Sequence, residues 1–113
     1  MANAKRIYPP YEAAGGVIET VQTYTTSFTL TTGDGVGTAL CYATAASIVA
    51  TLPLAANVPY RKITYKKMDT TVHTITPTAS GSDIVELAVG LNLSLYREAI
   101  TLQSDGTAAW MAI

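Results

Sequence analysis

The chain has 113 residues and a mass of 11.9 kDa, enough for one domain with its own core but not for a sizeable second domain. Hydrophobic residues make up 49% of it and charged residues only 13%, so much of the surface has to be uncharged. The net charge of −1 gives no general attraction to nucleic acid or to an anionic membrane, which argues against both as partners.

Residues 1–16 differ in composition from the rest of the chain and predict an extended N-terminal arm. Pro9 and Pro10 keep the backbone extended and remove two backbone N–H donors, and Gly15-Gly16 would act as a hinge. Such a segment can dock on a neighbouring molecule, or it can be a frayed tail with no role. The residues expected to dock are Lys5, Arg6, Tyr8, Pro9, Pro10 and Tyr11.

The arm does not read as a signal peptide. Lys5-Arg6 is followed by Ile-Tyr-Pro-Pro-Tyr instead of a long apolar run. We therefore expect assembly in a reducing cytoplasm. A single cysteine, Cys41, excludes an intramolecular disulfide and reads as a small buried hydrophobe.

The rest of the chain, residues 17–113, predicts one all-β domain. Short runs with period-2 alternation are separated by Gly, Pro, Asp and Ser, a pattern typical of an antiparallel β-sandwich or a jelly roll. No internal repeat is evident. The expected strands are 17–22, 26–31, 36–43, 47–52, 60–67, 71–76, 83–88, 91–102 and 107–113.

The last two of these strands predict a hairpin. In the first, Glu98, Ile100 and Leu102 share one face. The turn follows at residues 104–107, where Gly106 is free to take a positive φ.

A rival interpretation is a membrane span, because no charged residue occurs between Asp34 and Arg61. Pro53 and Pro59, together with several glycines and threonines, make this stretch a poor transmembrane helix. Strands explain it better.

No motif predicts catalysis, a cofactor or a metal. The glycines of residues 32–37 match neither the dinucleotide fingerprint nor the P-loop, so a hairpin turn at Asp34-Gly35 is favoured. His73 is the only histidine and reads as a sheet residue. The carboxylates fall mostly at turns, where Asp commonly caps the backbone. We therefore expect no enzyme activity.

One strand, 60–67, is basic. Lys62, Thr64 and Lys66 would share a solvent-exposed face of the strand, and Ile63 and Tyr65 the opposite, packed face. The segment has four basic residues, which are split between its two faces: Arg61, Lys62, Lys66 and Lys67. In one interpretation they protect a sheet edge or face solvent. In the other, Lys62 and Lys66 form an electrostatic contact with an acidic surface on another subunit.

Several segments occur in an order that resembles small β-domains of tailed-bacteriophage virion proteins. They are residues 27–36, 50–53, 61–67, 75–77 and 100–107, with Trp110. Ala108-Ala109 before Trp110 departs from the pattern, where a bulkier polar residue would be expected, and puts a ligand contact there in doubt.

The resemblance implies a homotrimer located on the outer capsid surface of a virion and assembled in the host cytoplasm. Its function would be that of a capsid decoration (cement) protein, which binds the major capsid protein and stabilises the shell. The low charge fits subunits that cover one another.

Two other functions stay open. One is a tail-fibre or tail-tip module that binds a receptor or glycan, and the other is a cellular β-sandwich adaptor. The aromatic residues that could stack on a sugar are Tyr24, Tyr42, Tyr60, Tyr65, Tyr96 and Trp110.

Overall fold

The structure, a computed structural model, describes residues 20–86 and 92–113. The described chain is all-β, as predicted, apart from one short 3-10 helix at Ala55–Asn57. Its strands are β1 (Thr20–Tyr24), β2 (Phe28–Thr29), β3 (Val36–Cys41), β4 (Ile48–Thr51), β5 (Lys62–Lys67), β6 (Ile75–Thr78), β7 (Ile84–Glu86), β8 (Ala99–Ser104) and β9 (Ala109–Ala112).

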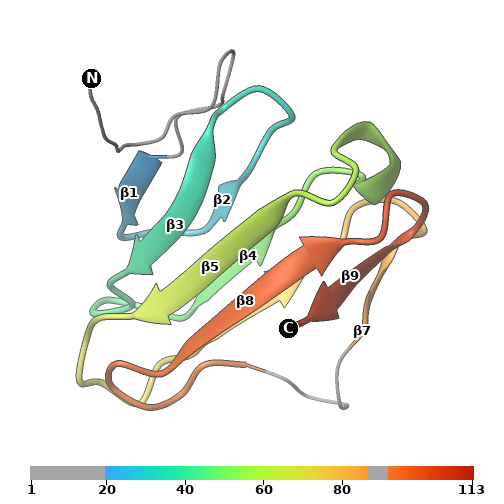
Figure 1. Ribbon diagram of the computed structural model, residues 1–113. Coiled ribbons are helices and arrows are strands. Elements are labelled where there is room, and N and C mark those ends of the chain that lie inside the picture. The colour runs from blue at the N-terminus through green and yellow to red at the C-terminus, as the bar shows by residue number, and fades with distance from the viewer. Residues whose placement is uncertain (1–19, 87–91) are drawn as a thin grey trace, which may run out of the picture.

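The strands form two sheets, and from β1 to β6 the chain alternates between them, whereas β7, β8 and β9 all belong to the larger sheet. The larger sheet has the order β1-β3-β5-β8-β9-β7 and the smaller one β2-β4-β6. Figure 1 shows the smaller sheet behind the larger one. From β1 to β6 each pair of consecutive strands makes one coil, and the next coil stacks beside it. The arrangement is solenoid-like.

The antiparallel pairing expected for the domain is wrong for most of it. β1, β3 and β5 pair in parallel, as do β2, β4 and β6. Period-2 alternation is the same in parallel and antiparallel strands, so the pattern did not distinguish them. The connections between the strands decide the pairing. From β1 to β6 each connection takes the chain to the other sheet, and the chain then returns to the first sheet in its original direction, which makes neighbouring strands parallel.

Antiparallel pairing occurs at the C-terminal end of the larger sheet. β8 pairs with β5 and with β9, and the β8–β9 hairpin confirms the prediction, with Gly106 at a φ of 82°. The strand expected over 91–102 begins only at Ala99. Before it, the Glu98 carboxylate accepts hydrogen bonds from the backbone N–H groups of Ser94 and Leu95 and holds a turn.

The same hydrogen bond recurs between neighbouring coils, and it was not predicted from the sequence. Ser27 Oγ accepts a hydrogen bond from the Val49 N–H at 2.9 Å, and Ser47 Oγ accepts one from the Thr74 N–H at 3.0 Å. Each serine stands just before a strand of the smaller sheet and bonds to the next coil. The repeat is short and its spacing unequal, which is why it is hard to recognise in the sequence.

The core lies between the sheets. Alternate residues of β5, Ile63 and Tyr65, are fully buried, and Trp110 of β9 is also fully buried and donates from Nε1 to the Pro53 carbonyl at 3.1 Å. Cys41 is buried here, as predicted. Burial raises the pKa of its thiol to about 12, with the nearby Asp69 charge acting in the same direction.

Part of the predicted domain organisation falls outside the described residues. The arm, residues 1–16, is not described, and the domain expected to begin at residue 17 is described from Thr20. None of the helices in the described ranges is long and apolar enough to cross a membrane.

Candidate functional site

Lys62 and Lys66 lie on the outer face of β5, in the larger sheet, as predicted. Lys62 is exposed and Lys66 half-buried, and they stand roughly 13 Å apart at the usual strand rise. Their partners in register on β8 are Gln103 and Ala99, neither of which carries charge. Among the described residues neither lysine forms a salt bridge.

The rest of this outer face is almost uncharged. Register pairing places Thr38 of β3 beside Thr64 of β5, and Thr64 beside Thr101 of β8. The Thr64 and Thr101 hydroxyls hydrogen-bond to each other at 2.8 Å. We call this surface the outer threonine face, defined by Thr38, Leu40, Lys62, Thr64, Lys66, Ala99, Thr101 and Gln103.

The other two basic residues of the segment 60–67, Arg61 and Lys67, make contacts within the chain. Arg61 donates to the carbonyls of Thr31 and Val36, at 2.8 and 2.9 Å, and forms an ion pair with Asp34. Burial raises the pKa of the Asp34 carboxyl, but hydrogen bonds from the Val36 and Thr31 amides and from Arg61 outweigh it, and the pKa is lowered. Arg61 therefore holds the loop between β2 and β3.

That loop was expected to be a hairpin turn. Asp34-Gly35 does make a turn, with Gly35 at a φ of 71°, but β2 and β3 belong to different sheets and so do not form a hairpin. A hollow of about 520 Å³ lies between residues 32–36 and residues 58–61. Its lining is mainly apolar, and Arg61 at its wall is already engaged with the loop.

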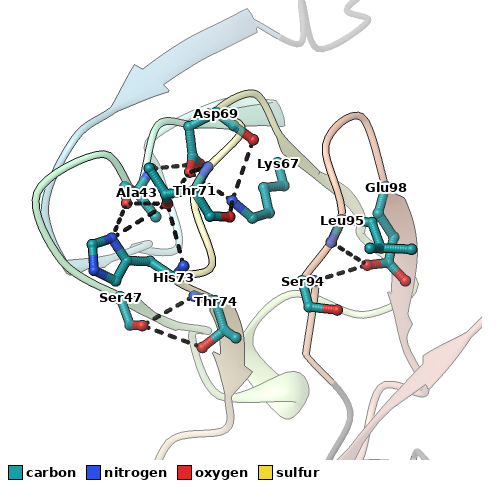
Figure 2. Close-up of polar contacts among 10 residues, drawn as sticks. All are labelled: Ala43, Ser47, Lys67, Asp69, Thr71, His73, Thr74, Ser94, Leu95 and Glu98. Atoms are coloured by element: carbon teal, nitrogen blue, oxygen red, sulfur yellow. Dashed lines mark hydrogen bonds and ion pairs between the residues drawn. The ribbon is translucent and has the colours of Figure 1, made fainter.

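Lys67 is fully buried at the end of β5 and pairs with Asp69 at 2.6 Å (Figure 2). Its ammonium group also donates to the Thr71 carbonyl at 3.0 Å. Asp69 accepts further hydrogen bonds from Thr71 and, through Oδ1, from the Ala43 N–H at 2.8 Å. The pair ties the loop after β3 to the loop after β5.

Hydrogen bonding sets the charge state of this pair. Burial by itself raises the pKa of the Asp69 carboxyl, but the hydrogen bonds from Lys67, from the Thr71 hydroxyl and from two backbone amides lower it more. Asp69 is therefore ionised at neutral pH, next to the hydrogen-bonded Nζ of Lys67.

His73 completes this corner, and the prediction that it is a sheet residue is wrong. It lies in the loop before β6, with Nδ1 2.7 Å from the Ala43 carbonyl oxygen (Figure 2). Asp69 and Thr71 hold residues 69–73 out of the sheet, so β6 begins at Ile75 instead of residue 71.

The expectation that aspartates cap turns is confirmed. Asp105 Oδ1 accepts hydrogen bonds from the N–H groups of Thr107, Ala108 and Ala109, which lowers its pKa, and Asp83 accepts one from the Ala55 N–H. No group of three His, Cys, Asp or Glu residues within 20–86 and 92–113 is arranged to hold a metal ion.

Within the described ranges the aromatic residues do not gather at one exposed edge. Trp110 and Tyr65 are buried, and Tyr24 is half-buried and stacked on Phe28 with ring centroids 3.6 Å apart. Tyr60 and Tyr96 are exposed. They precede β5 and β8, which are antiparallel, so they stand at opposite ends of the sheet.

The predicted site residues are therefore only partly brought together. Lys62 and Lys66 share one face, while the arm residues Lys5, Arg6, Tyr8, Pro9, Pro10 and Tyr11 lie outside the described residues. The internal contacts of Arg61 and Lys67 were not predicted. Strand alternation carried a signal for Lys67, since it places that residue on the same face as Ile63 and Tyr65.

Comparison of the chain with protein-family models, with curated proteins and with solved structures found no match.

Proposed function

We propose that this chain is a non-enzymatic structural protein of a phage virion, a decoration protein that binds the outer surface of the head as a homotrimer and stabilises the shell. The observation that carries the proposal is the outer threonine face. It extends over β3, β5 and β8, and its only charges are Lys62 and Lys66. The resemblance to small β-domains of tailed-bacteriophage virion proteins is the reason for proposing a phage particle.

A face of this composition suits contact with other subunits. Interfaces between identical subunits are depleted of charge, and threonine hydroxyls can hydrogen-bond across them without the cost of burying a charge. The two isolated lysines would then meet acidic side chains of a neighbouring subunit, which gives the contact its orientation.

The arm is the proposed contact with the major capsid protein. In the sequence it precedes β1, which begins at Thr20 and is one of the two edge strands of the larger sheet in the described part of the chain. Three arms on one trimer would bind the shell with a gain in effective concentration, so that each arm can bind weakly.

Two measurements test the proposal. A cryo-electron microscopy map of the parent particle should show many trimers over the head. Particles assembled with a chain that lacks residues 1–14 should have lost most of this density. Copies confined to the tail would contradict the proposal, and unchanged occupancy without the arm would remove its docking role.

The second candidate is a tail-tip module that binds a glycan. The observation in its favour is Tyr60, which is 69% exposed and held at a positive φ of 61°, an unusual conformation for a large residue. If Tyr60 is a sugar-stacking platform, Tyr60→Ala should abolish binding to host-cell glycans, whereas Tyr96→Ala should not. Equal binding by both variants would exclude this role.

A further inference from the structure

Two residues other than glycine in the described chain have a positive φ, and they are Tyr60 and Arg97. Arg97 has a φ of 69°, in the left-handed region where a Cβ atom is crowded against the backbone. Glycine adopts this conformation without that cost, and a large residue that persists there often marks a functional position. Arg97 is exposed, so packing in the core does not explain why an arginine stands there.

Arg97 belongs to a turn that the rest of the chain holds firmly. The Leu95 carbonyl accepts a hydrogen bond from the Glu98 N–H at 3.0 Å, and with a positive φ at its third residue this is a type II turn, where glycine is usual. The Glu98 carboxylate accepts hydrogen bonds from the Ser94 and Leu95 amides (Figure 2). The Arg97 N–H donates to the Lys67 carbonyl at 2.8 Å, which fixes the turn to the end of β5.

Three neighbouring side chains of this turn are exposed to solvent, and we call them the tip: Leu95, Tyr96 and Arg97. Leu95 is 68% exposed and Tyr96 49%. The guanidinium carbon of Arg97 lies 5.1 Å from the centroid of the Tyr96 ring. An exposed cation–π contact of this kind stabilises a protein by less than the left-handed conformation costs. The contact orients the two side chains, but it does not account for the arginine.

The tip has the composition and the rigidity of a binding site for a protein. Tyr and Arg are among the residue types that most often dominate the energy of protein interfaces. A turn that is already fixed loses little conformational entropy on binding. Within residues 20–86 and 92–113 Arg97 forms no salt bridge, so its charge is available to a carboxylate of the partner.

A second copy of this chain is a poor partner for the tip. The hollow between residues 32–36 and 58–61 is mainly apolar, but its Arg61 is paired with Asp34. It therefore offers Arg97 another arginine and a carboxylate that is already neutralised. This distribution of charge favours a different protein.

We propose that the tip is a second contact with the major capsid protein, in which Leu95 and Tyr96 enter an apolar pocket and Arg97 pairs with a carboxylate at its rim. The identity of the partner rests on the proposed function, and the chemistry of the pocket rests on the tip itself. The contact is separate from the arm, because its residues are held on the folded domain.

Binding of the full chain to heads assembled without it tests the inference. Arg97→Gly removes the charge and the strain together, so its affinity for the heads should fall at least about tenfold, while its stability in urea should not decrease. Equal affinity of this variant and the parent chain would overturn the tip as a contact, and a clear loss of stability would show that Arg97 serves the fold. A parent chain that does not bind heads would contradict the proposed function itself, and the inference with it.

Tyr60→Gly is the matched control, because it relieves the same backbone strain at the opposite end of the sheet. It should bind the heads as the parent chain does, whereas Tyr96→Ala, which keeps Arg97, should bind more weakly. Equal affinity losses in Tyr60→Gly and Arg97→Gly would show that they come from a change in the fold and would overturn the inference.

Sedimentation velocity separates a shell contact from a contact between copies of this chain. Arg97→Gly should keep the oligomeric state of the parent chain while it loses affinity for the heads. A variant that dissociates into smaller species would assign the tip to the subunit contact and overturn the inference equally.

Discussion

At the scale of single residues, the buried hydroxyl of Tyr65 lowers the stability of the fold. Its side chain is fully buried, its hydroxyl has no hydrogen-bond partner in the described structure, and burial raises its pKa. Tyr65→Phe keeps the ring and removes the unpaired group, so the free energy of unfolding should rise by about 1 kcal/mol in urea titrations.

Tyr24→Phe is the matched control, because Tyr24 is only half-buried and the change should stay within about 0.5 kcal/mol. A clear loss of stability in Tyr65→Phe would mean that the hydroxyl has a partner, such as a bound water.

The Lys67–Asp69 pair should respond strongly to removal of one charge. Asp69→Asn removes the carboxylate that pairs with the fully buried Lys67 and leaves a neutral group that accepts less well. Breaking a buried pair in this way typically costs about 3–5 kcal/mol, which should be visible in urea unfolding. A double variant, Lys67→Met with Asp69→Asn, should recover part of the loss. No recovery would mean that the hydrogen bonds of Asp69 to the loops matter more than its charge.

The same pair predicts how stability depends on pH. The pKa of Asp69 is lower in the folded protein than its unfolded value of about 3.9, so the unfolded state binds the proton more readily. The contribution is complete above the unfolded pKa and is lost as pH falls through that value toward the folded pKa. The pKa of Asp34 is shifted in the same direction.

Unfolding free energies measured from about pH 7 to about pH 2 should therefore fall at the acid end, and less steeply for Asp69→Asn than for the parent chain. Equal acid slopes for the two proteins would contradict the assignment of this pH dependence to Asp69.

At the scale of elements, the β8–β9 turn depends on a single glycine. Gly106 has a φ of 82°, a backbone conformation that residues with a side chain rarely adopt, so a side chain there is strained although Pro59 and Tyr60 leave it room. Gly106→Ala should lower the free energy of unfolding by about 1–2 kcal/mol. Gly33→Ala is the control, since a Cβ at Gly33 meets nothing within 4 Å. Equal effects of the two substitutions would contradict this explanation.

The positions of these elements were largely predictable, because each strand keeps its own alternation. The faces of β5 and the turn at Gly106 follow from residues next to one another in the chain. The parallel pairing of β1 with β3 does not, since it depends on where the chain goes between them. His73 and the late start of β8 were missed because Asp69 and Glu98 hold turns that compete with strand extension.

At the scale of the whole molecule, the sequence predicted a domain of low charge but not which surface is uncharged. Register settles this, since it aligns Thr38, Thr64 and Thr101 across three strands. A face built from residues on strands paired in this way cannot be recognised before the strand order is known.

The proposed trimer makes a prediction about this face. Thr38 is half-buried on the β3 side of the outer threonine face, while Thr51 is half-buried in the smaller sheet. A lysine at either position remains hydrated in the monomer and leaves the fold intact, but burying it in an interface without a partner is costly. In sedimentation equilibrium, Thr38→Lys should shift the protein from trimer to monomer and Thr51→Lys should not. A parent chain that is monomeric would contradict the trimer itself, and two trimeric variants would place the subunit contact on another surface.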